Sequence, residues 1–470
     1  MKTRILSLLL SLGLLLPAFA GCTGEPESAP LSGSSGESGI PADDSDTAAE
    51  EGEWPIPDYA GFVMPEATDS LTLYASDFTD AAMRRAVDLF KERYPDVTVN
   101  YTMMGEDELE ETMRAEIPAG RGPDVVMDYR GLLPDIYKSM STGIFTDLGP
   151  YIANDGEINP GDYFGNVMKG GQMFGKQYML PLTFEMSFLV TSRELLDANG
   201  IDPESLHTWE GFAAACRTYR ANNPDKLLLD FGGGLNQYYM SNLFGWSGMK
   251  MIDYEKNEVS FDEERFRDMM ELCHLYASPE PVNLDYGAGH ESVKNNECLF
   301  ISGGIDTSVL AMNECECIRH FSAQTPVLFS VADENGGLSV QIGYFAAVPE
   351  ASKNKLNAWR FVKILLSDAM QYGKEEAGKY PKTAFPTGNS VKKDAFERLT
   401  KLCKFWGGTE KEIGFVLDAA ERITNAVMPT PVIRRYVITI MREYVTDPDG
   451  TNYDKQFEKL INTLELYKDE

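Results

Sequence analysis

The sequence is poor in basic residues and in histidine. Its 470 residues include 42 Lys and Arg against 73 Asp and Glu, so the formal net charge is −31 at pH 7. A negative field of this size repels phosphate backbones, which argues against a nucleic-acid-binding protein. Only four histidines are present, so little imidazole is available for metal binding or acid–base catalysis. We expect a soluble, acidic protein that needs no metal or other cofactor.

Long apolar runs are also missing. A helix that spans a bilayer needs about 20 apolar residues, and the longest run here, residues 5–16, is shorter and interrupted. It follows a positively charged start, which is typical of an export signal. It leads into Phe19-Ala20-Gly21-Cys22, which resembles a bacterial lipobox, where a signal peptidase cuts before a lipid-modified cysteine. We predict a signal peptide over residues 1–21 and lipidation of Cys22, with plain secretion after Ala20 as the alternative.

Basic residues are absent from the stretch that follows. Residues 23–53 hold nine acidic residues and six serines but no Lys or Arg. Such a segment buries too little apolar surface to offset its chain entropy, and its like charges extend it. We predict that residues 22–69 are a lipid anchor and a disordered acidic tether.

Cysteines lack the spacing of a disulfide or zinc framework. Six of them follow Cys22 in the sequence: Cys216, Cys273, Cys298, Cys315, Cys317 and Cys403. An even number in an exported chain permits disulfides, but no second cysteine pair completes a zinc site with Cys315-Glu316-Cys317. We expect buried free thiols, with disulfides as the alternative.

Catalytic motifs are missing as well. The histidines do not stand in an HExxH or HxH pattern, and no GxSxG occurs. Phe231-Gly232-Gly233-Gly234 lacks the lysine of a phosphate-binding loop, so we interpret it as a backbone turn. Near the C-terminus, Asp447 and Asp449 begin a pattern similar to a calcium loop, but position 6 is Asn452 instead of glycine. We expect a turn there and a binding protein rather than an enzyme.

What is present is a regular alternation of strands and helices. Residues 71–73, 97–101 and 125–127 read as strands, and helices are expected between them, the second over residues 106–117. The first helix is expected to be capped by Ser76 or Asp77 and to bury Met83, Ala86, Val87, Phe90 and Tyr94. Further strands are expected at 184–190, 227–230, 298–301 and 344–348, and helices at 209–220, 261–276, 357–366 and from 401 onward. This pattern predicts an α/β fold with doubly wound sheets.

Several stretches of this pattern resemble the extracellular solute-binding proteins of bacterial ABC importers, of the maltose-binding-protein type. They are residues 86–99, Gly120-Arg121-Gly122-Pro123-Asp124-Val125-Val126, residues 143–148, Gly175-Lys176-Gln177-Tyr178-Met179-Leu180-Pro181, residues 195–201 with Thr208-Trp209-Glu210, and residues 347–361. Their order and spacing extend the resemblance over roughly residues 70 to 465.

The resemblance implies a two-lobe periplasmic-binding-protein-like fold (type II) with a three-segment hinge. We predict lobe 1 from residues 70–184 and 299–341, and lobe 2 from residues 185–298 and 342–470 with the C-terminal helices. The crossings are expected near 183–187, 299–302 and 341–344. The resemblance also implies a monomer that closes around a small solute and docks on the transmembrane subunits of an ABC permease. It would lie at the extracytoplasmic face of the membrane, held by its lipid alone.

Candidate site residues come first from the ends of strands, where ligands bind in open α/β sheets. This rule selects Asp77, Asp128, Tyr129 and Arg130. The alternatives are a helix N-cap for Asp77 and a salt bridge to Arg130 for Asp128.

Further candidates follow from the resemblance. Glu185 aligns with a glutamate that lines the cleft of the family, and cleft exposure would spare an apolar strand a buried charge. Three further candidates are aromatic rings on which a sugar can stack: Tyr238, Tyr239 and Trp246. The last two are Asp306, an acid where many sugar-binding members carry an aromatic ring, and Tyr344, a residue of the third crossing. A carbohydrate or oligosaccharide is the favoured ligand; a cationic or amine-bearing solute, a sensor role and a lipid-anchored glycosidase are the alternatives.

Overall fold

The computed structural model describes residues 52–129, 133, 135–229, 243, 247–277, 289–301, 308–332, 336–373 and 382–470. Its strands are β1 (Ser70–Ala75), β2 (Thr98–Met103), β3 (Val126–Tyr129), β4 (Gln172–Met173), β5 (Lys176–Gln177), β6 (Met179–Pro181), β7 (Thr183–Glu185), β8 (Leu189–Ser192), β9 (Leu227–Leu229), β10 (Ile252–Asp253), β11 (Glu258–Val259), β12 (Cys298–Phe300), β13 (Pro326–Phe329), β14 (Leu338–Ile342), β15 (Tyr344–Ala347), β16 (Asn389–Ser390) and β17 (Ile423–Val427).

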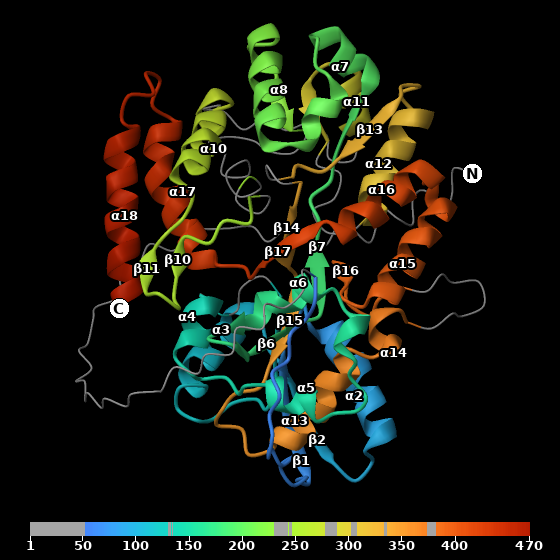
Figure 1. Cartoon of the computed structure of the whole chain (residues 1–470), viewed down its shortest axis with the longest axis vertical. Coiled ribbons are helices and arrows are strands. Elements are labelled where there is room, and N and C mark those ends of the chain that lie inside the picture. The colour runs from blue at the N-terminus through green and yellow to red at the C-terminus, as the bar shows by residue number, and fades with distance from the viewer. Residues whose placement is uncertain are drawn as a thin grey trace. The chain divides into compact units, whose positions relative to one another are not determined.

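Helices alternate with these strands, as Figure 1 shows. They are α2 (Asp80–Arg93), α3 (Glu106–Glu116), α4 (Ile136–Ser141), α5 (Gly149–Ala153), α6 (Gly165–Met168), α7 (Arg193–Asn199), α8 (Trp209–Asn222), α10 (Glu263–Leu275), α11 (Gly289–Lys294), α12 (Ser308–His320), α13 (Lys355–Leu365), α14 (Asp368–Gln371), α15 (Lys393–Lys401), α16 (Glu410–Glu421), α17 (Pro431–Val445) and α18 (Tyr453–Asp469). The predicted α/β class is confirmed. Within the described residues, no helix has the length and apolarity needed to cross a bilayer.

The first strands and helices follow the predicted pattern. β1 pairs in parallel with β2, and Leu73 forms a parallel bridge to Val125 just before β3. α2 buries the predicted face from Met83 to Phe90. The predicted cap is wrong, because the residue before α2 is Thr79 and its side chain makes no capping bond. Thr79 instead accepts a hydrogen bond from the Ser76 backbone N–H (2.9 Å), which tightens the turn after β1.

A predicted single strand over residues 184–190 is wrong. The structure divides it into β7, which pairs with β14 and β16, and β8, which pairs with β13. The chain changes sheets between Glu185 and Leu189, so no single ladder can continue through it. β14 and β15 are separated in the same way by Gly343, since β14 pairs with β7 and β17 whereas β15 lies between β3 and β6.

Two hydrophobic clusters form inside the compact unit that spans Ala49–Glu470. The first core includes Leu73, Phe90, Met127, Phe345 and Trp359. The second core includes Leu189, Phe212, Phe266, Phe329 and Met441. Burial of both clusters from water is the main favourable term for folding.

The division between the two cores differs from the predicted lobe boundaries. Phe188 packs in the first core and Leu189 in the second, only a few residues beyond the expected first crossing. The second and third crossings differ more from their predicted positions. Leu299–Ile301 belong to the second core, and buried residues from Leu338 to Met428 belong to the first. The predicted positions followed the order of family motifs along the chain, whereas side-chain packing determines where each segment is buried.

The predicted tether also ends earlier than residue 69. Trp54 is 4% exposed and belongs to the first core, and Ile56, Phe62 and Met64 pack against it. Aromatic and apolar residues return at Trp54, so burial begins there, well before β1.

The cysteines are present as the sequence predicts. All six downstream cysteines are free thiols, and all except Cys317 are buried.

Near the C-terminus, Asp447 accepts hydrogen bonds from the backbone N–H groups of Asp449 (3.3 Å) and Thr451 (3.1 Å), and α18 begins two residues later. The predicted turn is confirmed.

Candidate functional site

Four predicted site residues meet where β3, β7 and β15 end or change direction. β15 pairs with β3 so that Tyr344 lies opposite Tyr129 and Phe345 opposite Asp128. Glu185 ends β7 and lies opposite Gln341 of β14. Because Gly343 alone separates β14 from β15, the two pairings bring Glu185 close to the tyrosine pair.

The tyrosines form a stack. The ring centroids of Tyr129 and Tyr344 are 4.5 Å apart, with an interplanar angle of 22°. Phe78 and Phe385 also contact the pair with tilted rings, Phe78 at a centroid distance of 6.2 Å from Tyr129 and Phe385 at 5.4 Å from Tyr344. Tyr344 is completely buried and donates its hydroxyl hydrogen to the Phe78 carbonyl oxygen at 3.0 Å. Only Tyr129 of this pair is partly exposed, so Tyr344 supports it from the buried side.

Two carboxylates lie beside the stack. The Tyr129 hydroxyl donates to Glu185 Oε1 at 3.4 Å. Asp128 accepts from the backbone N–H groups of Tyr129 (2.6 Å) and Leu133 (3.2 Å), so it holds the chain that leaves β3. The expected cleft exposure of Glu185 is wrong for this conformation, because the residue is only 1% exposed. Its contact with Tyr129 places the carboxylate at the hydroxyl end of the ring.

A second pair of acids lies at the same edge. Asp77 is exposed and immediately precedes Phe78, the residue whose carbonyl oxygen receives the Tyr344 hydroxyl. Partial burial of the carboxyl group raises the pKa of Glu106, and the neighbouring charges of Asp107, Asp128 and Asp77 raise it further. The edge formed by the ends of β1 and β3 therefore carries a negative potential that attracts hydroxyl hydrogens and cations.

A tight contact fixes the geometry of this group. Thr183 is buried, and its Oγ1 accepts the Tyr344 backbone N–H at 2.9 Å. A Cβ atom on Gly343 would lie 2.6 Å from that oxygen, and one on Gly388 would lie 2.5 Å from it. These are distances that real Cβ atoms do not adopt, so glycine is required at both positions. Thr183 thus positions the backbone that carries both Glu185 and Tyr344.

Several predicted site residues lie outside the described residues: Cys22, Arg130, Tyr238, Tyr239, Trp246 and Asp306. Phe78, Thr183 and Gly343 are not among the predicted site residues. Phe78 directly follows the selected Asp77, so the strand-end rule could have found it. Thr183 and Gly343 lie within the expected crossings, but the contact between them joins distant segments and has no signal in the sequence.

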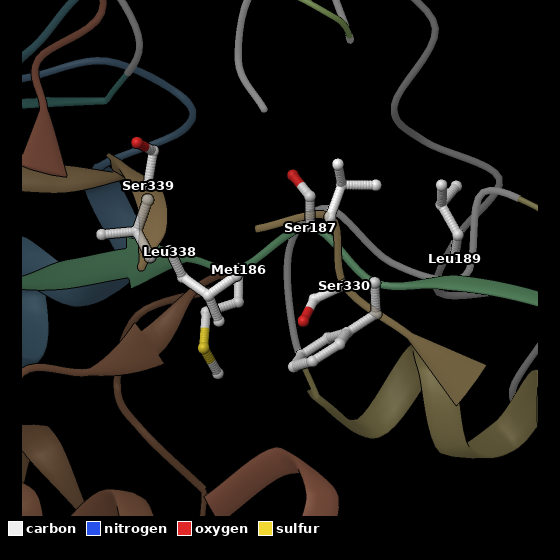
Figure 2. A pocket seen from close by; sticks show the side chains of 9 residues that line it. Met186, Ser187, Leu189, Ser330, Leu338 and Ser339 are labelled. Carbon is white, nitrogen blue, oxygen red and sulfur yellow. The ribbon is translucent and has the colours of Figure 1, made fainter. Parts of the chain in front are cut away.

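The two cores are connected near a small hollow (Figure 2). It is lined by residues from the β7–β8 and β13–β14 connections: Met186, Ser187, Phe188, Leu189, Ser330, Val331, Leu338, Ser339 and Val340. Its cavity volume is only about 10 Å³, room for about one water molecule, so the connection between the cores is well packed. Among the described residues, no group of three or more His, Cys, Asp or Glu side chains is arranged to hold a metal ion.

A family model described as bacterial extracellular solute-binding protein matches residues 75–372. No curated protein matches the sequence. Among solved structures, the chain is similar to the sugar-binding protein MalE from Xanthomonas citri, with a TM-score of 0.59 and 15% identity, covering 85% of this chain and 97% of that one. It is also similar to the cyclic alpha-maltosyl-1,6-maltose binding protein from Arthrobacter globiformis, with a TM-score of 0.56 and 15% identity, covering 84% of this chain and 98% of that one. These likenesses show the fold.

Proposed function

Because this chain belongs to the family of bacterial extracellular solute-binding proteins, we propose that it captures a carbohydrate or oligosaccharide at the Tyr129 site and delivers it to an ABC permease. The observation that carries the proposal is the stacked pair of tyrosines at an acidic edge of the fold. A sugar ring presents C–H groups that suit an aromatic face and hydroxyl groups that donate to carboxylates. Tyr129 offers the face, the buried Glu185 orients it by accepting its hydroxyl hydrogen, and the exposed Asp77 can accept ligand hydroxyl groups.

The names of two similar proteins support a saccharide ligand. One is a sugar-binding protein and the other a binding protein for a cyclic maltose-derived saccharide. At 15% identity the ligand itself does not transfer, because a few side chains in the site determine specificity.

A cationic or amine-bearing solute is the second candidate. The negative edge around Glu106, Asp77 and Asp128 favours it, because an ammonium group would lower the pKa of Glu106 again. Titration with polyamines and with amino acids in parallel with oligosaccharides separates the two ligand classes.

The experiment that tests the proposal is a thermal-shift screen followed by calorimetric titration. A ligand that binds only the folded protein raises the stability by RT ln(1 + [L]/Kd). We expect at least one oligosaccharide from a glucan, mannan or xylan series to shift the transition and to bind with 1:1 stoichiometry. Mass spectrometry of the recovered sugar should show it unchanged, whereas cleavage would favour a glycosidase.

We also propose that Cys22 carries the lipid that keeps the protein at the extracytoplasmic face of the membrane. The lipobox-like stretch and the acidic segment that follows it support this anchor. Cys22→Ser should release the protein from the membrane fraction into the medium, while Cys317→Ser, a thiol within the folded part, should not.

A further inference from the structure

Residues 52–62, the strap, lie along the first core next to α5, α6 and the β4–β5 hairpin. Trp54 approaches Tyr163 edge to face, with centroids 5.6 Å apart and an interplanar angle of 79°. Its indole N–H donates to Gln177 Oε1 at 2.8 Å. Farther along the strap, Phe62 packs edge to face on Tyr151 at 5.1 Å. Two aromatic side chains of the strap therefore pack edge to face on rings of the first core.

Hydrogen bonds hold the side-chain amide of Gln177 in the orientation that the strap requires. Its side chain is 1% exposed, and its amide nitrogen donates to the carbonyl oxygens of Met168 (3.1 Å) and Met179 (2.5 Å). Two acceptors around the nitrogen fix the orientation of the amide, so the oxygen must face a donor. Trp54 supplies that donor, and its removal would leave a buried oxygen without it.

Asp147 receives the other end of the strap. One of its oxygens accepts the Tyr59 hydroxyl at 3.3 Å, and the other accepts the backbone N–H groups of Gly149 (2.9 Å) and Gln177 (3.1 Å). Burial raises the pKa of Tyr59 to about 12, and the adjacent Asp147 charge contributes. The tyrosine therefore stays protonated at neutral pH and remains a donor.

Two glycines of the first core leave room for the strap. A Cβ atom on Gly165, at the start of α6, would lie 2.3 Å from the Gly52 carbonyl oxygen and 2.4 Å from the Glu53 carbonyl carbon. A Cβ atom on Gly149, at the start of α5, would lie 2.4 Å from the Tyr59 hydroxyl oxygen. Any other residue at these positions would displace the strap or the helix.

We propose that α5, α6 and the β4–β5 hairpin form a docking site for an extended peptide, and that its occupant is the chain's own strap. The sequence Trp54-Pro55-Ile56-Pro57 suits this role, because two prolines keep the free segment extended and reduce the entropy lost on docking. The fused strap is at high effective concentration, so the site stays filled.

The docked strap changes where the preceding acidic segment is attached. That segment joins the folded part at Trp54 on the first core instead of at β1. With the lipid anchor in place, docking of the strap shortens the tether by about 60 Å of extended chain. This consequence rests on the proposed function. The docking site itself does not depend on the anchor or on the ligand.

Protease protection and hydrogen exchange test the docking site in the whole exported chain carrying Cys22→Ser. In the wild-type strap, cleavage by chymotrypsin after Tyr59 and Phe62 should be at least tenfold slower than in a synthetic peptide of residues 50–66. Gly165→Ala should bring cleavage close to the peptide rate, because its Cβ occupies the place of the strap backbone. Gly156→Ala is the matched control, since nothing lies within 4 Å of that Cβ position.

A second variant keeps the test decisive if Gly165→Ala does not fold. Trp54→Phe retains a ring but lacks the N–H that Gln177 receives, so cleavage after Tyr59 should accelerate several-fold while the far-UV circular dichroism stays unchanged. A wild-type strap that is cut as fast as the free peptide would overturn the proposal. Equal protection in the wild type, Gly165→Ala and Trp54→Phe would overturn it too.

Discussion

The rings of Tyr129 and Tyr344 stack at 4.5 Å across the β3–β15 pairing, and Tyr344 is completely buried beneath its partner. This relationship explains why a partly exposed tyrosine can serve as a rigid surface. Hydrogen bonds fix both ends of the stack, one from Tyr344 to the Phe78 carbonyl oxygen and one from Tyr129 to Glu185. A ligand that binds on such a preorganised ring loses little free energy in ordering it.

Replacement of the supporting ring should weaken ligand binding without removing any ligand contact. Tyr344→Ala deletes the ring behind Tyr129 and leaves a cavity, so we expect affinity to fall at least tenfold and stability by about 3 kcal/mol. Tyr344→Phe keeps the stack and loses only the bond to Phe78, worth about 1 kcal/mol. Calorimetric titration and urea unfolding measure the two effects. Equal affinities for both variants would contradict a supporting role.

The contact between Gly343 and Thr183 should be sensitive to a single methyl group. Gly343→Ala places a Cβ 2.6 Å from Thr183 Oγ1, and overpacking of this kind costs about 1–3 kcal/mol. The affinity should fall as well, because the same backbone carries Tyr344. Urea unfolding of Gly343→Ala, with Gly156→Ala as the control, provides the measurement. A Gly343→Ala protein as stable as the control would show that the contact relaxes freely.

A buried ion pair in the first core should make stability depend on acid pH. Asp155 accepts hydrogen bonds from Trp359 (2.7 Å) and pairs with Lys363 (2.8 Å). Burial alone would raise the pKa of Asp155, but the hydrogen bonds from Lys363, the Glu157 backbone and Trp359 outweigh it, and the net direction is down. A lowered pKa in the folded state means stability that is complete above the unfolded pKa of about 3.9 and is lost as the pH falls through the folded value.

The unfolding free energy should therefore fall more steeply below about pH 4 in the wild type than in Asp155→Asn. Asp88→Asn, at an exposed position of α2, serves as the control and should follow the wild-type curve. Urea titrations between pH 3 and 7 give the comparison. Parallel curves for the wild type and Asp155→Asn would exclude a contribution from this pair.

The cysteines should react slowly in the native protein. Burial raises the pKa of Cys317 to about 11 and that of Cys403 to about 12, and it raises those of Cys216 and Cys273 further. The thiolate is the reactive form, so a thiol reagent at pH 7 should label less than one equivalent within minutes. In 6 M guanidinium, the same reagent should label six thiol equivalents of the unfolded Cys22→Ser chain. A total of four or fewer under non-reducing conditions would indicate a disulfide.

The sequence predicted local elements better than contacts between distant segments. The apolar face of α2 and the short strand around Met127 follow from spacing within one segment, and both are present, although the strand extends to Tyr129. The change of sheet between β7 and β8 is invisible to periodicity, because Met186 and Phe188 are as apolar as strand residues. Trp54 falls within the predicted tether because the regular pattern of strands and helices begins only near residue 71, yet its buried indole and one hydrogen bond hold it on the first core.

In the candidate site, too, features of one segment could be predicted better than contacts between distant segments. The strand-end rule selected Asp128 and Tyr129, and the resemblance added Glu185, which the fold brings to Tyr129. Exposure could not be predicted, since the burial of Glu185 and Tyr344 depends on how β7, β14 and β15 pack together.

The most direct test of the account is calorimetric titration of the wild type and Tyr129→Ala with the oligosaccharide that shifts the unfolding transition most. The account predicts 1:1 binding by the wild type, with affinity reduced at least 30-fold in Tyr129→Ala at unchanged folding, or about 2 kcal/mol of binding free energy. Equal affinity in the two proteins, or binding of polyamines with no oligosaccharide bound at all, would contradict it.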